Sequence, residues 1–430
     1  MSQQGQKVII DPNVVGTVAG YGASAAQSTG SLAQAHAPNL HTLSPRASGA
    51  IAKDRVSSLA GRDFRLDLFR GISLLLIFID HIPDNFLAFF TLQSVSFSDA
   101  AEIFYFISGY VAAMVYGKVL LQHGLFAASL KIYKRVWTLF IAHIVLFMVF
   151  VAEVSISVNH SGHWIYNTQL RVDDFLAEPG TAMFKALTLQ FQPVYLDILP
   201  LYIVFLMVFP LVLKGLSRNA LLVMIPSVLS YLGVQLWNWN LPSYPEGHTW
   251  YFDPFAWQFL FLLGAYCGFT KLTGRRILPQ SRWVFAVAIG FLAVAGAIQF
   301  SATLHGLSEA IPRVLSFIVV ADKTTLAPLR IFNFVALAIV AATLIPQQAR
   351  FLTNPIGWSI VRCGQHSLHV FCFSIILAVI SQIVMQEIDG GVPLQVAVNV
   401  IGIGSMLGFG TLMSWLRHEG KLPPPPQTVS

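Results

Sequence analysis

Long apolar runs alternate with short polar segments from about residue 66 to about residue 415. Ten of these runs have close to the roughly 20 residues that a helix needs to cross a bilayer. They lie at about 66–82, 98–118, 136–156, 197–213, 220–237, 254–270, 284–300, 329–346, 359–382 and 393–415, with longer polar connections at about 157–196, 238–253 and 301–328. The pattern predicts an all-α polytopic membrane protein with about ten transmembrane helices.

Composition and charge agree with a membrane protein and give it an orientation. Only 11% of the residues are charged, against about 25% in soluble domains, which excludes an ordinary soluble enzyme and a nucleic-acid-binding protein. If the N-terminus is cytoplasmic, most of the 26 Lys and Arg residues fall on the inner side. The outer side then holds Arg171, Lys185, Arg313, Lys323 and Arg330. The positive-inside rule therefore predicts that both termini are cytoplasmic.

The two ends of the chain differ from the apolar middle. Residues 1–60 are rich in Gly, Ala, Ser and Gln and contain no run that spans a bilayer, a composition typical of disordered segments. No apolar stretch follows a basic start, so we expect no cleavable signal peptide. We expect a disordered cytoplasmic tail at 1–60, a transmembrane domain at 61–418 and a short cytoplasmic tail at 419–430.

Ionisable residues at the predicted outer ends of the helices mark a candidate catalytic site, because such groups are costly at membrane depth. The first span ends in Asp80 and His81, and the second begins near Asp99 and Glu102. His81 is the candidate general base, with Glu102 or Asp80 as the carboxylate that orients its imidazole. The alternative is that Asp99 and Glu102 are solvated acids at a helix start, where the helix dipole favours them.

The inner end of the first span and the ninth span carry further polar groups. Arg65, Asp67 and Arg70 lie at the inner end, either as a binding site or as membrane anchors with Asp67 as the salt-bridge partner of the arginines. In the ninth span, Arg362, His366 and His369 are predicted to share one helix face. That stripe either lines a channel or joins helices by hydrogen bonds.

Aromatic residues gather in the polar connection at 238–253 and just beyond it. Flat aromatic faces suit sugar rings, so we predict a glycan-binding surface; an ordinary aromatic belt is the alternative. Its candidate residues are Trp239, Trp250, Tyr251 and Trp257, with the carboxylates Asp197 and Asp253. The spacing of His and Cys predicts no metal site.

Two stretches together resemble the OpgC family, succinyltransferases of osmoregulated periplasmic glucans related to the acyltransferase-3 superfamily. They are RLDLFRG at 65–71 ending in DHIP at 80–83, and DAAEIFYFISGY at 99–110. Stretches at 189–202, 253–259, 329–333 and 364–371 also fit, and the resemblance runs from about 62 to 418. One departure is that Arg65 and Arg70 are separated by four residues, where the superfamily usually separates its paired arginines by two.

The resemblance implies transfer of a succinyl group from cytoplasmic succinyl-CoA, a co-substrate, to hydroxyls of a periplasmic glucan at the bacterial inner membrane. No tightly bound cofactor is implied. The essential histidine would be His81, and Arg65, Asp67 and Arg70 would contact the acyl-CoA. Arg330 would pair with the succinyl carboxylate, unless it bonds Asp322 or Asp197. The expected partners are acyl-CoA, the glucan and membrane lipid. The alternatives are an acetyltransferase of a surface polysaccharide and a glycan or anion transporter.

Overall fold

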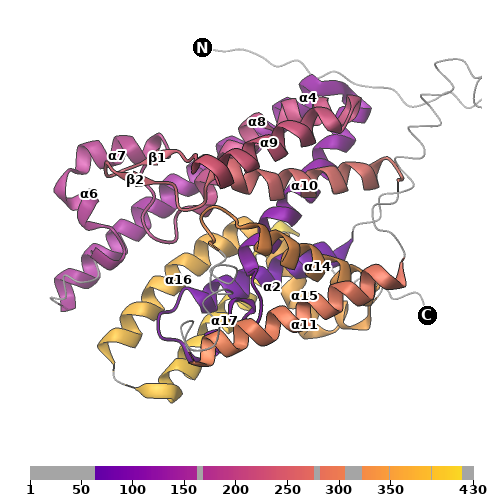
Figure 1. The fold of residues 1–430 in the computed structure, drawn as a ribbon. Coiled ribbons are helices and arrows are strands. Elements are labelled where there is room, and N and C mark those ends of the chain that lie inside the picture. Colours follow the sequence, from indigo (N-terminus) through magenta and orange to yellow (C-terminus); the bar gives the residue numbers. More distant parts are fainter. Residues whose placement is uncertain are drawn as a thin grey trace, which may run out of the picture. The chain divides into compact units, whose positions relative to one another are not determined.

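A computed structural model of the chain describes residues 63–161, 168–275, 281–305, 322–347, 349–388 and 390–418. The predicted tails at 1–60 and 419–430 lie outside these residues. The described part is almost entirely helical (Figure 1). Its elements are α2 (Phe64–Asp80), η1 (Phe86–Phe90), α3 (Leu92–Val95), α4 (Ala100–Ser161), α6 (Asp173–Ala177), α7 (Pro179–Leu187), α8 (Ile198–Arg218), α9 (Leu221–Trp237), β1 (Pro242–Ser243), β2 (His248–Thr249), α10 (Pro254–Leu272), α11 (Arg282–His305), α14 (Pro328–Leu344), η2 (Arg350–Leu352), α15 (Pro355–Gln365), α16 (Ser367–Glu387) and α17 (Gly391–Arg417). Strands β1 and β2 pair antiparallel, with Pro242 opposite Thr249.

Several of these helices have the length and apolar character of membrane spans. Within the described ranges, five helices are long and apolar enough to cross a bilayer: α4, α8, α11, α16 and α17. The apolar helices α9 and α14 are shorter. An all-α membrane protein is therefore confirmed, whereas ten spans and cytoplasmic termini stay predictions.

Two breaks in the helices bear on the predicted spans. The second and third predicted spans are the two helices of α4, which meet at a kink at Gly124, whose φ is 82°. The predicted ninth span is instead divided at His366 into α15 and α16. Arg362 and His369 consequently lie on different helices, so the predicted polar stripe on one continuous helix face is wrong.

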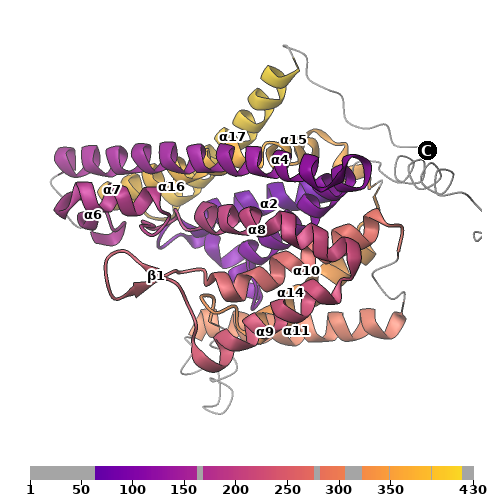
Figure 2. The ribbon, with the colours of Figure 1, turned by 90° about the horizontal axis from the view of Figure 1, so that it is seen from above.

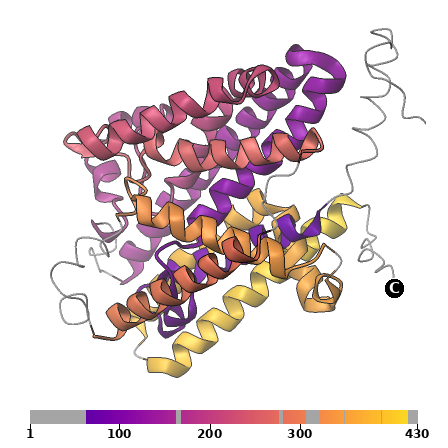
Figure 3. The ribbon, with the colours of Figure 1, turned by 45° about the vertical axis from the view of Figure 1, so that its right-hand side comes forward.

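Close helix packing depends on glycines that face the backbone of a neighbour. Gly109 of α4 lies against the carbonyl of Phe261, and Gly264 of α10 lies against the carbonyl of Phe106; a Cβ at either position would collide. Helix α4 also runs past α8 (Figure 2), and α11 lies beside α14 (Figure 3). These contacts fix where the helix ends meet.

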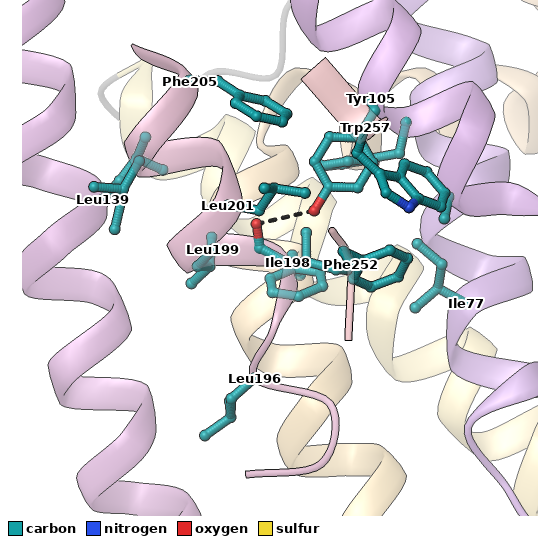
Figure 4. Packing of buried hydrophobic residues seen from close by; sticks show 14 of the residues in the cluster. Ile77, Tyr105, Leu139, Leu196, Ile198, Leu199, Leu201, Phe205, Phe252 and Trp257 are labelled. Carbon is teal, nitrogen blue, oxygen red and sulfur yellow. Dashed lines mark hydrogen bonds between the residues drawn. The ribbon is translucent and has the colours of Figure 1, made fainter. Parts of the chain in front are cut away.

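An aromatic cluster in the core joins α4, α8 and α10 close to the helix ends. The Tyr105 ring contacts those of Trp257 and Phe252, with centroids 5.2 and 5.8 Å away. Its hydroxyl donates a hydrogen bond of 3.2 Å to the carbonyl oxygen of Ile198 (Figure 4). Buried aromatic rings of this kind contribute large apolar contact areas, so the cluster holds these helix ends together.

Candidate active site

Five helix ends that the sequence places on one side of the membrane meet in the structure. Helix α2 ends at Asp80, with His81 as its C-cap. Asp197 and Asp253 are the N-caps of α8 and α10. The beginnings of α4 and α14 are joined by the ion pairs of Asp99 described next, and the N–H of Asp253 donates to the carbonyl of Thr324, just before α14, at 3.2 Å. The clustering of ionisable residues at one end of the helices is therefore a property of the fold.

A network of ion pairs forms the buried part of this site. Arg330 donates from Nε to Glu102 at 2.6 Å and from Nη2 to Asp99 at 3.1 Å. Lys323 Nζ lies 2.8 Å from the same Asp99 oxygen, Oδ2. Glu102, Asp99 and Arg330 are 0%, 7% and 8% exposed. Two carboxylates thus balance two cations, as burial of charge requires.

The same carboxylates also cap helix α4. Asp99 Oδ1 accepts a hydrogen bond from the backbone N–H of Ala101 at 2.7 Å, and Glu102 Oε2 accepts one from the N–H of Asp99 at 2.9 Å. This reciprocal arrangement resembles a capping box. One turn beyond Arg330, Asn333 accepts a hydrogen bond from the Ser98 hydroxyl at 2.8 Å. Helix α14 therefore fixes the residues that lead into α4.

The loop at 322–327, which carries Lys323, is held at successive backbone carbonyls. Trp257 Nε1 donates to the carbonyls of Lys323 and Thr324 at 3.0 and 3.1 Å. Gln235 donates to Thr325 O at 2.8 Å, and the Tyr231 hydroxyl donates to Leu326 O at 2.9 Å. Because side chains of α9 and α10 supply these bonds, both helices determine where Lys323 lies.

Two charged groups of this loop have shifted pKa values. Burial alone would lower the pKa of Lys323, but the negative charge of Asp99 raises it above its ordinary value. Burial would raise the pKa of Asp322, but hydrogen bonds from Thr325 and Thr324 lower it. The ammonium and the neighbouring carboxylate are therefore both charged at neutral pH.

The imidazole of His81 is held by an aromatic ring. The Tyr195 ring stacks on it with centroids 4.3 Å apart, and the Tyr195 hydroxyl donates to the His81 carbonyl at 3.0 Å. Within the described part of the chain, His81 Nδ1 has no hydrogen-bond partner, and no carboxylate bonds the imidazole. Asp80 is adjacent in sequence, and Glu102 is bonded to Arg330 and to its own helix start. The predicted orienting role of Glu102 or Asp80 is thus without support in this geometry.

The predicted acyl-CoA residues lie at the other end of α2. Arg65 forms a bidentate pair with Asp63 at 2.8 and 3.0 Å and donates to the carbonyl of Ile345 at 2.7 Å. Its salt-bridge partner is therefore Asp63, where the sequence suggested Asp67. Asp67 and Arg70 are half-buried on the following turns of the helix. The bond to Ile345 joins the start of α2 to the end of α14.

The predicted glycan-binding residues divide into exposed and buried groups. Trp239 and Tyr251 are each 50% exposed, and Asp197 is half-buried. Trp250, Trp257 and Asp253 are 4%, 0% and 1% exposed. Because the two buried indoles offer no free face to a sugar, their predicted stacking role needs correction: Trp257 instead holds the 322–327 loop. Asp253 caps α10 by accepting from the N–H of Phe255 at 2.8 Å.

Two residues of this site are absent from the sequence-based candidates. Lys323 was noted only as one of the cations of the predicted outer side. Tyr195 has no sequence pattern that links it to His81, which lies 114 positions earlier. Arg330 also has different partners from those expected, since it bonds Asp99 and Glu102 where Asp322 or Asp197 was suggested. In the described ranges, no group of three or more His, Cys, Asp and Glu residues suits a metal ion.

Comparison with known proteins places the described helices in one family. A family model described as "OpgC protein" matches residues 62–418. No curated protein and no solved structure matches the chain. The match covers every helix of the site, from α2 to α17.

Proposed function

Since the chain belongs to the OpgC family, we propose that it is a membrane O-acyltransferase that moves a succinyl group from succinyl-CoA to hydroxyls of osmoregulated periplasmic glucans. The observation that carries the proposal is the position of His81. This titratable side chain ends an apolar helix, beside a buried network of paired charges. Ionisable groups at such depth usually mark a functional site.

His81 would act as the general base. The imidazole accepts the proton of a glucan hydroxyl while the oxygen forms an ester bond to the acyl carbon. The carbon–sulfur bond of the thioester breaks, and the proton passes from the imidazole to the leaving thiolate. A positioned base of this kind typically contributes about 10²- to 10⁴-fold to the rate. Stacking on Tyr195 fixes the ring and leaves Nδ1 without a hydrogen-bond partner among the described residues.

The donor would approach along α2. This helix rises about 1.5 Å per residue, so Arg70 and His81 are separated by about 17 Å along the axis. The phosphates and the thioester of acyl-CoA would then contact opposite ends of one helix. Arg65 is paired with Asp63 and Ile345. We therefore assign Arg65 to holding the inner entrance in shape, at the end of α2 where Asp67 and Arg70 also lie.

The acceptor would lie at the outer loops, facing the periplasm. Tyr251 is half exposed and within electrostatic range of Lys323 and Asp99. A sugar stacked on its ring would therefore lie within the field of the charged network. Trp239 offers a second exposed aromatic face at the end of α9. These two rings are the glycan contacts that the exposure supports.

A transporter is the alternative that one observation favours. Transporters commonly contain interrupted helices at their binding site, and the described chain has such an interruption at His366, between α15 and α16. A transporter would move its cargo without making an ester. The product analysis below therefore separates the two functions.

The test is an acylation assay on the purified full-length protein in a bilayer. A neutral glucan is supplied with succinyl-CoA or acetyl-CoA, and mass spectrometry scores the acylated product. We expect a succinyl mass shift with the wild type and its loss in His81→Ala. His123→Ala, which removes an exposed histidine of α4, should retain activity. A folded wild type that acylates from neither donor would overturn the enzyme and favour the transporter.

A further inference from the structure

The two cations of the buried network, Arg330 and Lys323, differ in how accessible they are to a ligand. Arg330 uses Nε and Nη2 on two different carboxylates and is 8% exposed. Its guanidinium keeps further N–H donors, but they are buried with it, and a third carboxylate would have to enter a desolvated site that already holds two. Arg330 is therefore a poor site for an incoming anion, contrary to the expectation from the sequence.

Lys323 is more accessible to a ligand than Arg330. An ammonium has three donors, and in the described part of the chain the recorded ion pair of Lys323 is with Asp99 Oδ2 alone. That oxygen also accepts from Arg330, so Lys323 shares its carboxylate with a second cation, and two of its three donors are left for a ligand. The Lys323 side chain is 32% exposed. It can therefore meet a ligand without leaving its place.

The position of Lys323 relates it to both proposed substrates. Its Nζ lies 5.5 Å from the centroid of the Phe252 ring. Its charge acts on both His81 and Tyr251. The bonds from Trp257 to the loop carbonyls fix its backbone. An anionic group bound here would belong to the same charged cluster as the general base and the exposed aromatic ring.

From these observations we infer that the Lys323 ammonium binds the free carboxylate of a dicarboxylic acyl group and selects that donor over a neutral one. The inference rests on the proposed acyl transfer. A hydrogen bond to a charged group contributes about 1.5–3 kcal/mol, which corresponds to a selectivity of about 10- to 100-fold. Arg330 keeps Asp99 in place as the positioning residue of the site.

The test is a donor competition in which succinyl-CoA and acetyl-CoA are present together with the glucan. In Lys323→Met, we expect the ratio of succinyl to acetyl product to fall about 10- to 100-fold, with acetyl transfer retained. Lys323→Arg should keep most of the preference, because it keeps the charge. The product ratio does not depend on the active fraction, so partial unfolding of a variant does not affect it.

Lys185→Met is the matched control, because Lys185 is another lysine of the predicted outer side and its ammonium bonds Gln190 at 2.9 Å. Its product ratio should equal that of the wild type. An unchanged ratio in Lys323→Met, or equal losses with both donors, would overturn the role of Lys323 while leaving acyl transfer intact. A wild type that acylates from neither donor would overturn the proposed function and this inference together.

Discussion

The rings of His81 and Tyr195 stack at a centroid distance of 4.3 Å, with their planes inclined by 29°. The Tyr195 hydroxyl donates its one proton between two acceptors, the carbonyl of His81 at 3.0 Å and Gln382 Oε1 at 3.3 Å. The backbone of Tyr195 has a positive φ of 74°, which is uncommon for a residue with a side chain. One residue thus orients the imidazole and ties it to α16.

Substitutions of Tyr195 should separate its ring from its hydroxyl. Tyr195→Phe keeps the stack, so we expect kcat for acyl transfer to fall only about twofold. Tyr195→Leu removes an aromatic contact of about 0.5–1.5 kcal/mol, so kcat should fall up to about tenfold. Steady-state kinetics of both variants measure the difference. Equal losses would show that the hydroxyl, and not the stacking, holds His81.

Removal of Arg330 should destabilise the protein strongly. Arg330→Leu leaves Glu102 and Asp99 buried without their shared cation, a change that typically costs about 3–5 kcal/mol. Chemical unfolding in detergent measures the free energy. Arg218→Leu replaces an exposed arginine at the end of α8, and should alter stability by no more than about 0.5 kcal/mol. Similar effects of the two substitutions would contradict a structural role for the buried network.

The break within α4 predicts the effect of an alanine there. Gly124→Ala places a Cβ on a backbone with φ of 82°, which costs about 1–2 kcal/mol. Gly404 lies within α17 with nothing within 4 Å of a Cβ added there, so Gly404→Ala should be neutral or stabilising by up to about 1 kcal/mol. Thermal unfolding of both variants tests this. A stable Gly124→Ala protein would mean that α4 tolerates a continuous helix.

Asp253 should make stability depend on pH. Burial raises the pKa of this carboxyl to about 6, against about 3.9 in an unfolded chain. The folded state therefore binds the proton more tightly. Its contribution is fully present below about pH 4 and is lost as pH rises through about 6.

Asp253→Asn keeps a side-chain acceptor for the α10 cap and removes the titration. We expect the unfolding temperature of this variant to fall less between pH 4.5 and 7.5 than that of the wild type. Asp173→Asn, which removes an exposed carboxyl at the start of α6, should leave the wild-type slope unchanged. An unchanged slope in Asp253→Asn would contradict the assignment.

The apolar runs predicted the positions of most helices. The predicted span at 254–270 corresponds to α10 at Pro254–Leu272, because Asp253 followed by a proline is a strong start signal. The predicted separation of the second and third spans corresponds to the kink at Gly124. The helix after the kink begins earlier than the predicted third span and includes Lys131 and Lys134 as exposed side chains.

The sequence predicted some of the residues of the site, but not which side chains bond to one another. His81, Asp99, Glu102 and Arg330 stand out as ionisable groups at the ends of apolar runs. The Arg330–Glu102 bond joins residues 228 positions apart, and only the packing of α14 against α4 brings them together. Burial of Trp257 was equally unreadable, since an indole with a bonded N–H suits a core as well as a surface.

The tethered carbonyls of the 322–327 loop have a consequence for acyl chain length. If Lys323 binds the acyl carboxylate as proposed, a flexible anchor would follow the carboxylate of a longer or shorter chain, whereas an anchor fixed by Trp257, Gln235 and Tyr231 would keep one distance from His81. The loop would then select acyl chains by length. In a donor with one methylene more or fewer than succinyl, the thioester would lie at the wrong distance from the imidazole. A misplacement of about 1 Å can lower the rate about 100-fold.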